Sequence, residues 1–259
     1  MTAQLMGASD GASLILTLSN PEFRNALGPE MYAAGVEALN AAESNPEVRS
    51  VIITGEGSLF SAGGNLQRLL ANRQLPPEHQ AQSIEGLHNW IEAIRAFPKP
   101  VIAAVEGAAA GAGFSLALAC DLIVAARDSL FVMAYSTIGL SPDGGGTWSL
   151  SRLVPRQLAS ELVMCGERIG AERLHALGVV NRLSEPGQAL TVALELAAHI
   201  NDRAPNVMSS IKELLSDADG SHLNQQLARE RDQFVKNLHH PNAGIGIGAF
   251  LNKQKPIYE

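Results

Sequence analysis

The sequence predicts an α/β fold in which helices pack on a sheet. A unit made of a strand, a turn of small residues and a helix occurs at residues 50–72 and again at residues 101–120. The strands of both units have apolar centres, as expected for strands that are buried on both faces. Strands and helices that alternate in this way are typical of a sheet covered by helices.

The elements before residue 155 follow from their patterns and boundaries. A strand over residues 13–18 ends at the turn signal Asn20-Pro21. Proline is favoured in the first turn of a helix, so Pro29 is expected to begin the next helix, which Asn45-Pro46 ends. The same reasoning predicts strands at 48–54, 101–105, 121–126 and 130–134, and helices at 66–72, 80–97, 114–120 and 147–153.

From Pro155 onward the pattern is mostly helical. Helices are predicted at 156–165, 171–177, 186–200, 205–216, 223–238 and 243–252, with one short strand at 179–183. We therefore expect a core domain over residues 1–200 and a helical region over residues 201–259. That region is expected to pack as a subdomain or against another subunit.

Composition and charge argue against several classes of function. Apolar residues make up 46% of the 259 residues and charged residues 17%, as in a globular protein with a large core. The formal net charge of -7 argues against nucleic acid or an anionic membrane as a partner. No stretch approaches the ~20 consecutive apolar residues of a membrane-spanning helix, and residues 1–11 lack the pattern of a secretory signal. The two cysteines, Cys120 and Cys165, lie in apolar segments, which favours reduced thiols and a cytoplasmic protein without a metal site.

Two turns of small residues follow the buried strands. Gly63-Gly64 precedes one expected helix, and Gly111-Ala112-Gly113 precedes another. Bare backbone amides at the start of a helix can bind an anion or an oxyanion. Because the turns follow neighbouring strands, we expect them to bring two amides near one point. The alternative is that both turns are only sites of close packing.

Five motifs follow one another along the chain. They are Asn20-Pro21 with Arg24-Asn25-Ala26-Leu27, the segments 60–66, 99–107 and 111–121, and Gly139-Leu140-Ser141-Pro142-Asp143-Gly144-Gly145-Gly146-Thr147. In this order and spacing the chain resembles the crotonase (enoyl-CoA hydratase/isomerase) family over nearly its whole length. The resemblance implies the crotonase α/β fold, with repeated ββα units and a helical C-terminal region for trimerisation. It also implies an acyl-CoA thioester as substrate, with coenzyme A as part of that substrate and no other cofactor.

The resemblance further implies that two backbone N–H groups, those of Gly64 and Ala112, hold the thioester oxygen. Family hydratases use two glutamates, and Ser115 and Tyr135 occupy those two positions here. A serine or tyrosine with its ordinary pKa is not a ready base for water. Asp143 matches the acidic residue of several family isomerases, and one carboxylate is enough for a 1,3-proton shift. Its surroundings are most similar to the ring-epoxide and Δ3,Δ2-enoyl-CoA isomerases of aerobic phenylacetate breakdown.

Each of these side chains also has a structural interpretation. Asp143 can cap the helix expected at Thr147, or it can be a plain turn residue before the glycines. Tyr135 can donate to the substrate or only line the pocket, and Ser115 can be a small helix residue that faces its neighbours. His88 lies on the helix before the central strand, where some family dehalogenases pair a histidine with an aspartate; a histidine on a helix is more often solvated or packed.

Contacts with coenzyme A are implied for four residues. Arg24 occupies a position where the family often has a basic contact to the nucleotide, and the backbone of Ala62 would meet the adenine. Phe250 and Lys253 match a C-terminal pair that reaches the coenzyme A of a neighbouring subunit, although Lys253 can equally be a solvated terminal charge. The resemblance therefore implies homotrimers, or hexamers made of two trimers.

We expect an enzyme that forms an enolate at the Gly64 and Ala112 amides and isomerises an unsaturated acyl-CoA with Asp143 as the single acid/base. Three alternatives remain open: an enoyl-CoA hydratase in fatty-acid or aromatic-acid breakdown, a ring-opening enzyme similar to oxepin-CoA hydrolases, and a non-catalytic acyl-CoA binder. Turnover that depends on Asp143 separates the last class from the others.

Overall fold

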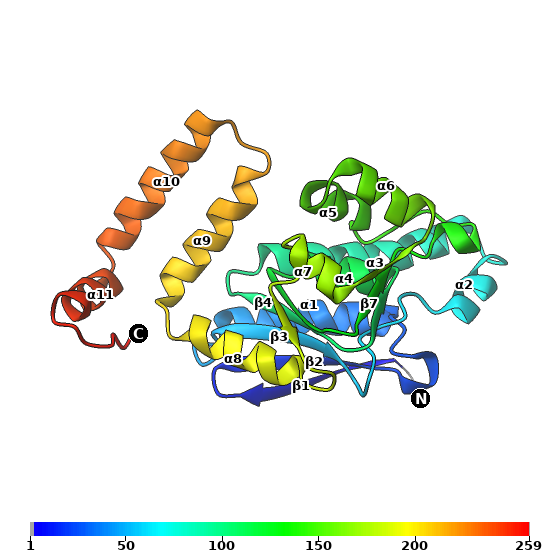
Figure 1. The fold of residues 1–259 in the computed structure, drawn as a ribbon, viewed down its shortest axis with the longest axis horizontal. Helices are drawn as coiled ribbons and strands as arrows, with labels where there is room; N and C mark the ends of the chain where they lie inside the picture. The colour runs from blue at the N-terminus through cyan, green and yellow to red at the C-terminus, as the bar shows by residue number, and fades with distance from the viewer. Residues whose placement is uncertain (1–2, 259) are drawn as a thin grey trace.

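The computed structural model describes residues 3–258 and is built on a six-stranded sheet (Figure 1). The strand order is β1-β2-β3-β4-β6-β9. β1 pairs antiparallel with β2, and every other neighbouring pair is parallel. The strands are β1 (Gln4–Asp10), β2 (Ser13–Ser19), β3 (Ser50–Gly55), β4 (Val101–Val105), β6 (Leu122–Ala126) and β9 (Arg182–Ser184). With the helices that cover it, this sheet confirms the predicted α/β fold.

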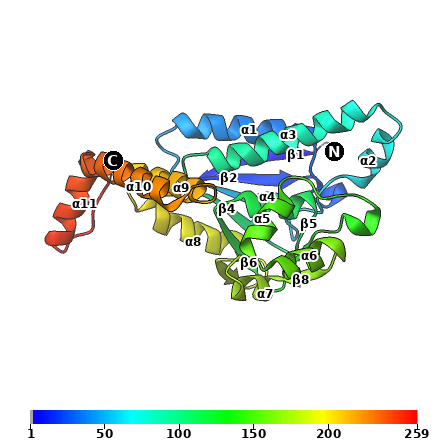
Figure 2. The ribbon, with the colours of Figure 1, turned by 90° about the horizontal axis from the view of Figure 1, so that it is seen from above.

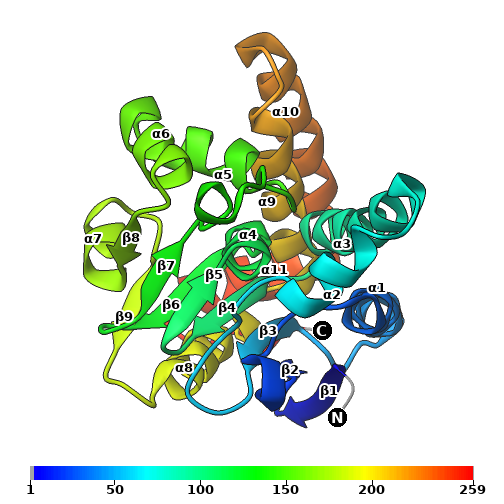
Figure 3. The same cartoon turned by 90° about the vertical axis from the view of Figure 1, so that its right-hand side faces the viewer.

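Helices cover both faces of the sheet. α1 (Pro29–Ser44) and α3 (Pro77–Ala96) lie side by side over one face, and α8 (Ala189–Asn201) lies on the other (Figure 2, Figure 3). The side chains of β4 alternate between these faces. Val101, Ala103 and Val105 join the larger core, whereas Ile102 and Ala104 pack with α8. All five side chains are fully buried, so β4 runs through the apolar centre of the molecule.

A smaller sheet continues from the ends of β4 and β6. It consists of β5 (Ala108–Ala110), β7 (Leu130–Val132) and β8 (Arg168–Gly170). The helices near it are α2 (Leu66–Asn72), α4 (Ala112–Ala119), α5 (Gly146–Leu153), α6 (Arg156–Met164) and α7 (Ala171–Ala176). Because only Gly111 separates β5 from α4, the small sheet determines where α4 begins.

Several boundaries differ from the sequence-based expectation. β1, β5 and β8 were not expected, since β1 is mostly exposed and the other two strands have three residues each. α3 begins at Pro77 rather than at residue 80, because proline fits the first turn of a helix. α4 begins at Ala112 rather than at residue 114, which places the Ala112 amide in the first turn. β9 begins at residue 182 rather than 179, because the amides of Val179 and Val180 donate to Leu174 at the end of α7.

The last three helices extend away from the sheet (Figure 1). α9 (Pro205–Ala218) and α10 (Leu223–Leu238) form an antiparallel pair, and α11 (Pro241–Leu251) follows them. Lys212 anchors α9 to the body, because its Nζ lies 2.8 Å from Asp121 Oδ2. The same Nζ donates to the carbonyl oxygens of Ile94 and Lys99, at 2.9 and 3.3 Å.

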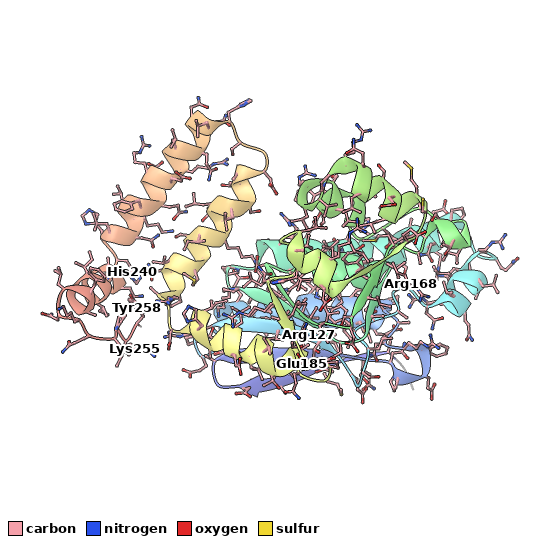
Figure 4. The ribbon with its side chains drawn as sticks, viewed as in Figure 1. Arg127, Arg168, Glu185, His240, Lys255 and Tyr258 are labelled. Atoms are coloured by element: carbon pink, nitrogen blue, oxygen red, sulfur yellow. The ribbon has the colours of Figure 1, made fainter. Side chains whose placement is uncertain are left out.

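The tail after α11 returns to the start of α9. Arg49 donates to the carbonyl oxygen of Tyr258 at 2.9 Å, and Lys255 pairs with Asp202 at 2.7 Å. Figure 4 shows Lys255 and Tyr258 together at this end of the molecule. The division of the chain at residues 200 and 201 stays a prediction. Within residues 3–258, no helix has both the length and the apolar character needed to cross a membrane.

Replacing Lys212 with Met should lower the free energy of unfolding by about 2 kcal/mol, because Asp121 and two carbonyl oxygens lose a charged donor. Urea denaturation followed by circular dichroism measures this loss. Lys255→Met is the matched control: the Lys255 side chain is 73% exposed, so its ion pair should contribute less than about 1 kcal/mol. Equal losses in the two variants would contradict the anchoring role of Lys212.

Candidate active site

The turn that follows β3 is joined to β5 by a short parallel bridge. Ser61 is the bridging residue, and Ala109 is its partner. The Ser61 amide donates to Ala108 at 3.0 Å, and the Ala110 amide donates to the Ser61 carbonyl oxygen at 2.9 Å. The two small-residue turns predicted from the sequence therefore lie against each other.

The segment that begins at Asn20-Pro21 supports this pair of turns from the side. Ser61 Oγ donates to the carbonyl oxygen of Asn25 at 2.8 Å, and the Leu27 amide donates to Gly63 at 2.7 Å. The Asn25 side chain, which is buried, donates to the carbonyl oxygens of residues 56 and 59. This sequence motif therefore holds the glycine turn in place.

Gly63 makes the closest approach between the turns. Its φ of +87° lies in the left-handed region, and an added Cβ would stand 2.5 Å from Ala110 O and 3.2 Å from Ala112 N. Only glycine has both the conformational freedom and the missing side chain that this approach requires. The chain just before Gly64 therefore passes directly beside the start of α4.

Gly64 and Ala112 both border one cavity of about 400 Å³. Ala112 is the first residue of α4, where backbone N–H groups have no acceptor within the helix. Gly64 stands between Gly63 and Asn65, the residue that caps α2. The partial positive charge at the start of α4 adds to these two donors. Together they are suited to an oxygen that gains negative charge.

Apolar and ionisable side chains both line this cavity. Asp143 is the one carboxylate, and Arg68 is the one lysine or arginine, among the described residues that border it. The apolar part of the lining is Leu66, Leu69, Ile84, Leu87, Ile138 and Leu140. The cavity thus combines an apolar lining with one anionic and one cationic group.

Asp143 is held by contacts from two other elements. Tyr135 Oη donates to Asp143 Oδ1 at 2.6 Å, and Ser115 Oγ on α4 donates to the Asp143 carbonyl oxygen at 3.0 Å. The residue that caps α5 is Gly145, and no side chain bonds to that helix start. Asp143 is therefore not the cap of α5. It begins a hydrogen-bonded turn before that helix, because the Gly146 amide donates to its carbonyl oxygen at 3.2 Å, and it also borders the cavity.

The glycines after Asp143 let its loop lie directly on Ser115. An added Cβ at Gly144 would stand 3.0 Å from Ser115 Cβ, and one at Gly146 would stand 2.7 Å from Ser115 Oγ. Ser115 is 1% exposed. The loop therefore occupies the space that a longer side chain at position 115 would need.

Tyr135 stays protonated as a hydrogen-bond donor. Burial raises its pKa strongly, and the negative charge of Asp143 and the hydrogen bond to it raise the pKa further. The Tyr135 ring also lies beside the small-residue turn that precedes α4, since a Cβ added at Gly111 would stand 3.5 Å from Tyr135 Cζ. Tyr135 thus touches both the amide turn and the carboxylate.

Tyr32 and Arg68 border the same cavity and were not expected from the sequence. Tyr32 comes from α1 and Arg68 from α2, so no local pattern connects them. Burial raises the pKa of Tyr32, while the charge of Arg68 and a hydrogen bond with it oppose that shift. The two side chains are therefore neighbours in the cavity wall.

His88 also borders the cavity, from α3. Its Nδ1 lies 3.9 Å from a Glu85 carboxylate oxygen, and its side chain is 42% exposed. The hydrogen bond found for the Asp143 carboxylate comes from Tyr135 rather than from His88. In the described part of the chain, no group of three or more His, Cys, Asp or Glu side chains is arranged to hold a metal ion.

The four residues predicted to contact coenzyme A separate into two places. The Ala62 amide donates to the carbonyl oxygen of Arg24 at 3.0 Å, and Ala62 borders the cavity, whereas Arg24 is exposed beside it. Phe250 and Lys253 lie at the end of α11 and do not border the cavity of their own chain. Figure 1 shows α11 at the opposite end of the molecule from α2.

A second groove, of about 490 Å³, lies between α9 and the body. Trp148 lines it and is stacked between two guanidinium groups, with Arg95 at 4.3 Å and Arg152 at 4.0 Å from the ring centre. Neither small-residue turn reaches this groove. Gly64, Ala112 and Asp143, the residues predicted to carry the chemistry, therefore border the smaller cavity and not this groove.

Comparisons with known proteins agree with this fold. The family model described as "Enoyl-CoA hydratase/isomerase" matches residues 10–259. The 1,2-epoxyphenylacetyl-CoA isomerase of Escherichia coli K12 is 35% identical over 246 residues, which cover 95% of this chain and 94% of that protein. The 2,3-dehydroadipyl-CoA hydratase of the same organism is 34% identical, with coverage of 95% and 94%. The crystal structure of an enoyl-CoA hydratase from Polaromonas sp. JS666 is 69% identical, with a TM-score of 0.98 and coverage of 98% and 99%.

The chain belongs to the enoyl-CoA hydratase/isomerase (crotonase) family of enzymes, which act on acyl-CoA thioesters. The fold is the crotonase α/β fold with C-terminal helices, as the resemblance implied.

Replacing Gly63 with Ala should lower the free energy of unfolding by about 1–3 kcal/mol more than Gly57→Ala does. Both glycines have positive φ, at +87° and +74°, so alanine is strained at either position. Only at Gly63 does the added Cβ meet backbone atoms; at Gly57 nothing lies within 4 Å. Urea denaturation of both variants measures the difference, and equal losses would show that the turns do not pack as closely as described.

Proposed function

We propose that this enzyme isomerises an unsaturated acyl-CoA by a proton shift in which Asp143 is the single acid/base. The observation that carries the proposal is that Asp143 is the one carboxylate among the described residues that border the cavity. Hydration in this family is expected to need two carboxylates, and Ser115 and Tyr135 stand at those positions. A proton shift between two carbons needs one group that accepts a proton and returns it.

The proposed reaction converts a 3-enoyl thioester into a 2-enoyl thioester. Asp143 takes a proton from C2, and the electrons of that C–H bond move into the enolate. Asp143, whose carboxyl proton exchanges with solvent, then gives a proton to C4, while the double bond moves from C3–C4 to C2–C3 and the thioester carbonyl re-forms. Because Tyr135 donates to Oδ1, the Oδ2 atom of Asp143 is the oxygen left for the transferred proton.

The amides of Gly64 and Ala112 would hold the enolate oxygen. An enolate is too basic to form at neutral pH unless its charge is stabilised, and one such donor contributes about 3–4 kcal/mol to catalysis in other enzymes. The proximity of the two turns, fixed by Gly63 and by the Ser61 bridge, supports this assignment. Tyr135 would keep Asp143 at a constant position relative to these amides.

Hydration of an enoyl-CoA is the second candidate. It is favoured by the names of two relatives, the 2,3-dehydroadipyl-CoA hydratase and the enoyl-CoA hydratase from Polaromonas. The lining weighs against it, because Asp143 is the one carboxylate among the described residues that border the cavity. A ring substrate, as in the 1,2-epoxyphenylacetyl-CoA isomerase, is a variant of the isomerase proposal that the same single carboxylate serves.

We further propose that the chain assembles into trimers or hexamers in the cytoplasm. Large apolar side chains stay exposed on the last helices, among them Phe234 at 69% and Phe250 at 84%. Phe250 and Lys253 would then contact the coenzyme A of a neighbouring subunit, with Arg24 and Ala62 contacting it from the subunit that holds the acyl group.

Asp143→Asn should lower kcat for a 3-enoyl-CoA by at least about 10³-fold, because an amide cannot accept the proton. The reaction is run in heavy water, and mass spectrometry distinguishes deuterium uptake from addition of water. Asp128→Asn is the control, since Asp128 is exposed on a turn outside the cavity. Water addition to a 2-enoyl-CoA by the wild type would sink the isomerase proposal in favour of the hydratase.

Tyr135→Phe should lower kcat by about 10- to 100-fold, the range for a lost hydrogen bond to a charged group. KM should change little if Tyr135 acts by positioning Asp143, to which its phenol donates. The raised pKa of Tyr135 keeps the phenol protonated through pH 10, so this hydroxyl should cause no alkaline loss of wild-type activity below that pH. Tyr258→Phe, far from the cavity, is the control; a rise in KM without a fall in kcat would contradict the positioning role.

A further inference from the structure

Arg68 is fixed in the cavity wall from both ends. Its backbone amide donates to Asn65 Oδ1 at 3.1 Å in the first turn of α2, and its Nη2 donates to the Leu27 carbonyl oxygen at 3.1 Å. Asn65 directly follows Gly64, so the turn that presents the oxyanion amide also places this guanidinium. The side chain therefore has a defined position relative to the reacting carbonyl.

The positive charge of Arg68 has no ion-pair partner within the described residues. No carboxylate oxygen of residues 3–258 lies within 4 Å of its guanidinium nitrogens. Its Nε is buried without an acceptor. The Glu30 carboxylate is near, because a Cβ added at Gly28 would stand 2.7 Å from Arg68 Nη1 and 3.2 Å from Glu30 Oε2, but it lies beyond ion-pair distance of the guanidinium. A partly buried charge without a partner is costly, which is the pattern expected where a bound anion supplies the missing charge.

Tyr32 places a second donor beside this guanidinium. Tyr32 is 5% exposed and borders the cavity, so a ligand group that meets its hydroxyl lies inside the protein. The phosphates of coenzyme A, by contrast, are strongly hydrated groups and are suited to an exposed cation such as Arg24. The neighbouring lining includes Leu66, Leu69 and Ile84, which are suited to the methylene groups of an acyl chain.

We propose that Arg68 and Tyr32 form a carboxylate-binding subsite at the acyl end of the cavity, and that the natural substrate is an acyl-CoA whose acyl chain carries a second carboxylate. A planar guanidinium presents several N–H donors to a carboxylate, and a phenol adds one more. This inference rests on the proposed function for the identity of the acyl-CoA site, and its test does not need turnover.

The test compares the binding of saturated acyl-CoAs of four, six and eight carbons, each with and without a terminal carboxylate. Isothermal titration calorimetry on the wild-type protein should give tighter binding of the carboxylate form for at least one chain length. Arg68→Met should raise the Kd of that compound by about 10- to 100-fold, the range for a hydrogen bond to a charged group. The Kd of its neutral counterpart should stay within about threefold.

Three further variants make the result specific. Arg68→Lys keeps the charge and should restore part of the affinity, and Tyr32→Phe should weaken binding of the carboxylate form alone. Arg73→Met removes an exposed arginine just after α2 and should change neither compound. The thermal midpoint of each variant shows whether it is folded.

Two results would overturn the inference. Equal weakening of the carboxylate and neutral compounds in Arg68→Met would place Arg68 at coenzyme A or in the fold. Tighter binding of the neutral compound at every chain length would show that no carboxylate subsite exists. The isomerase proposal can fail while this inference holds. In that case the protein would not move the double bond of a 3-enoyl-CoA, but its affinity for the carboxylate compound would still depend on Arg68.

Discussion

The pairing of Ser61 with Ala109 is the constraint on which the site depends. It brings the turn after β3 against β5, the strand that leads into α4. The pairing thereby places Gly64 and Ala112, whose amides are proposed to hold the oxyanion, on neighbouring turns. Glycine at position 63 is required because backbone atoms of the other turn stand where a side chain would be. Hydrogen bonds from Asn25 and Leu27 hold the turn after β3 in this position, close to the turn before α4.

The position of the carboxylate depends on the same short helix. α4 presents the Ala112 amide at its start and, one turn later, the hydroxyl of Ser115 that binds the Asp143 loop. This eight-residue helix thus contacts both the turn proposed to hold the oxyanion and the loop that carries the proposed base. Tyr135 adds a third contact, because its ring lies beside Gly111 and its hydroxyl bonds to Asp143. The proposed proton shift from C2 to C4 tolerates little variation in these positions.

The parts of this arrangement that are local in sequence were predictable. Strongly apolar strands and glycine turns indicated the alternating α/β units, and the family motifs indicated Gly64, Ala112 and Asp143. The exposed edge strand β1 has no clear alternation, and β5 consists of three alanines whose strand conformation comes from pairing with β7. Contacts between distant segments left no signal: the Tyr135 bond to Asp143 and the meeting of Tyr32 with Arg68 arise only when separate elements pack together.

Ser115 on α4 and the glycines at 144 and 146 lie close together, because a Cβ added at either glycine would stand 3.0 Å or less from the Ser115 side chain. These glycines therefore let the Asp143 loop lie on α4, where Ser115 Oγ donates to the Asp143 carbonyl oxygen. This contact places Asp143 beside the start of α4, which is the arrangement that the proposed single acid/base requires.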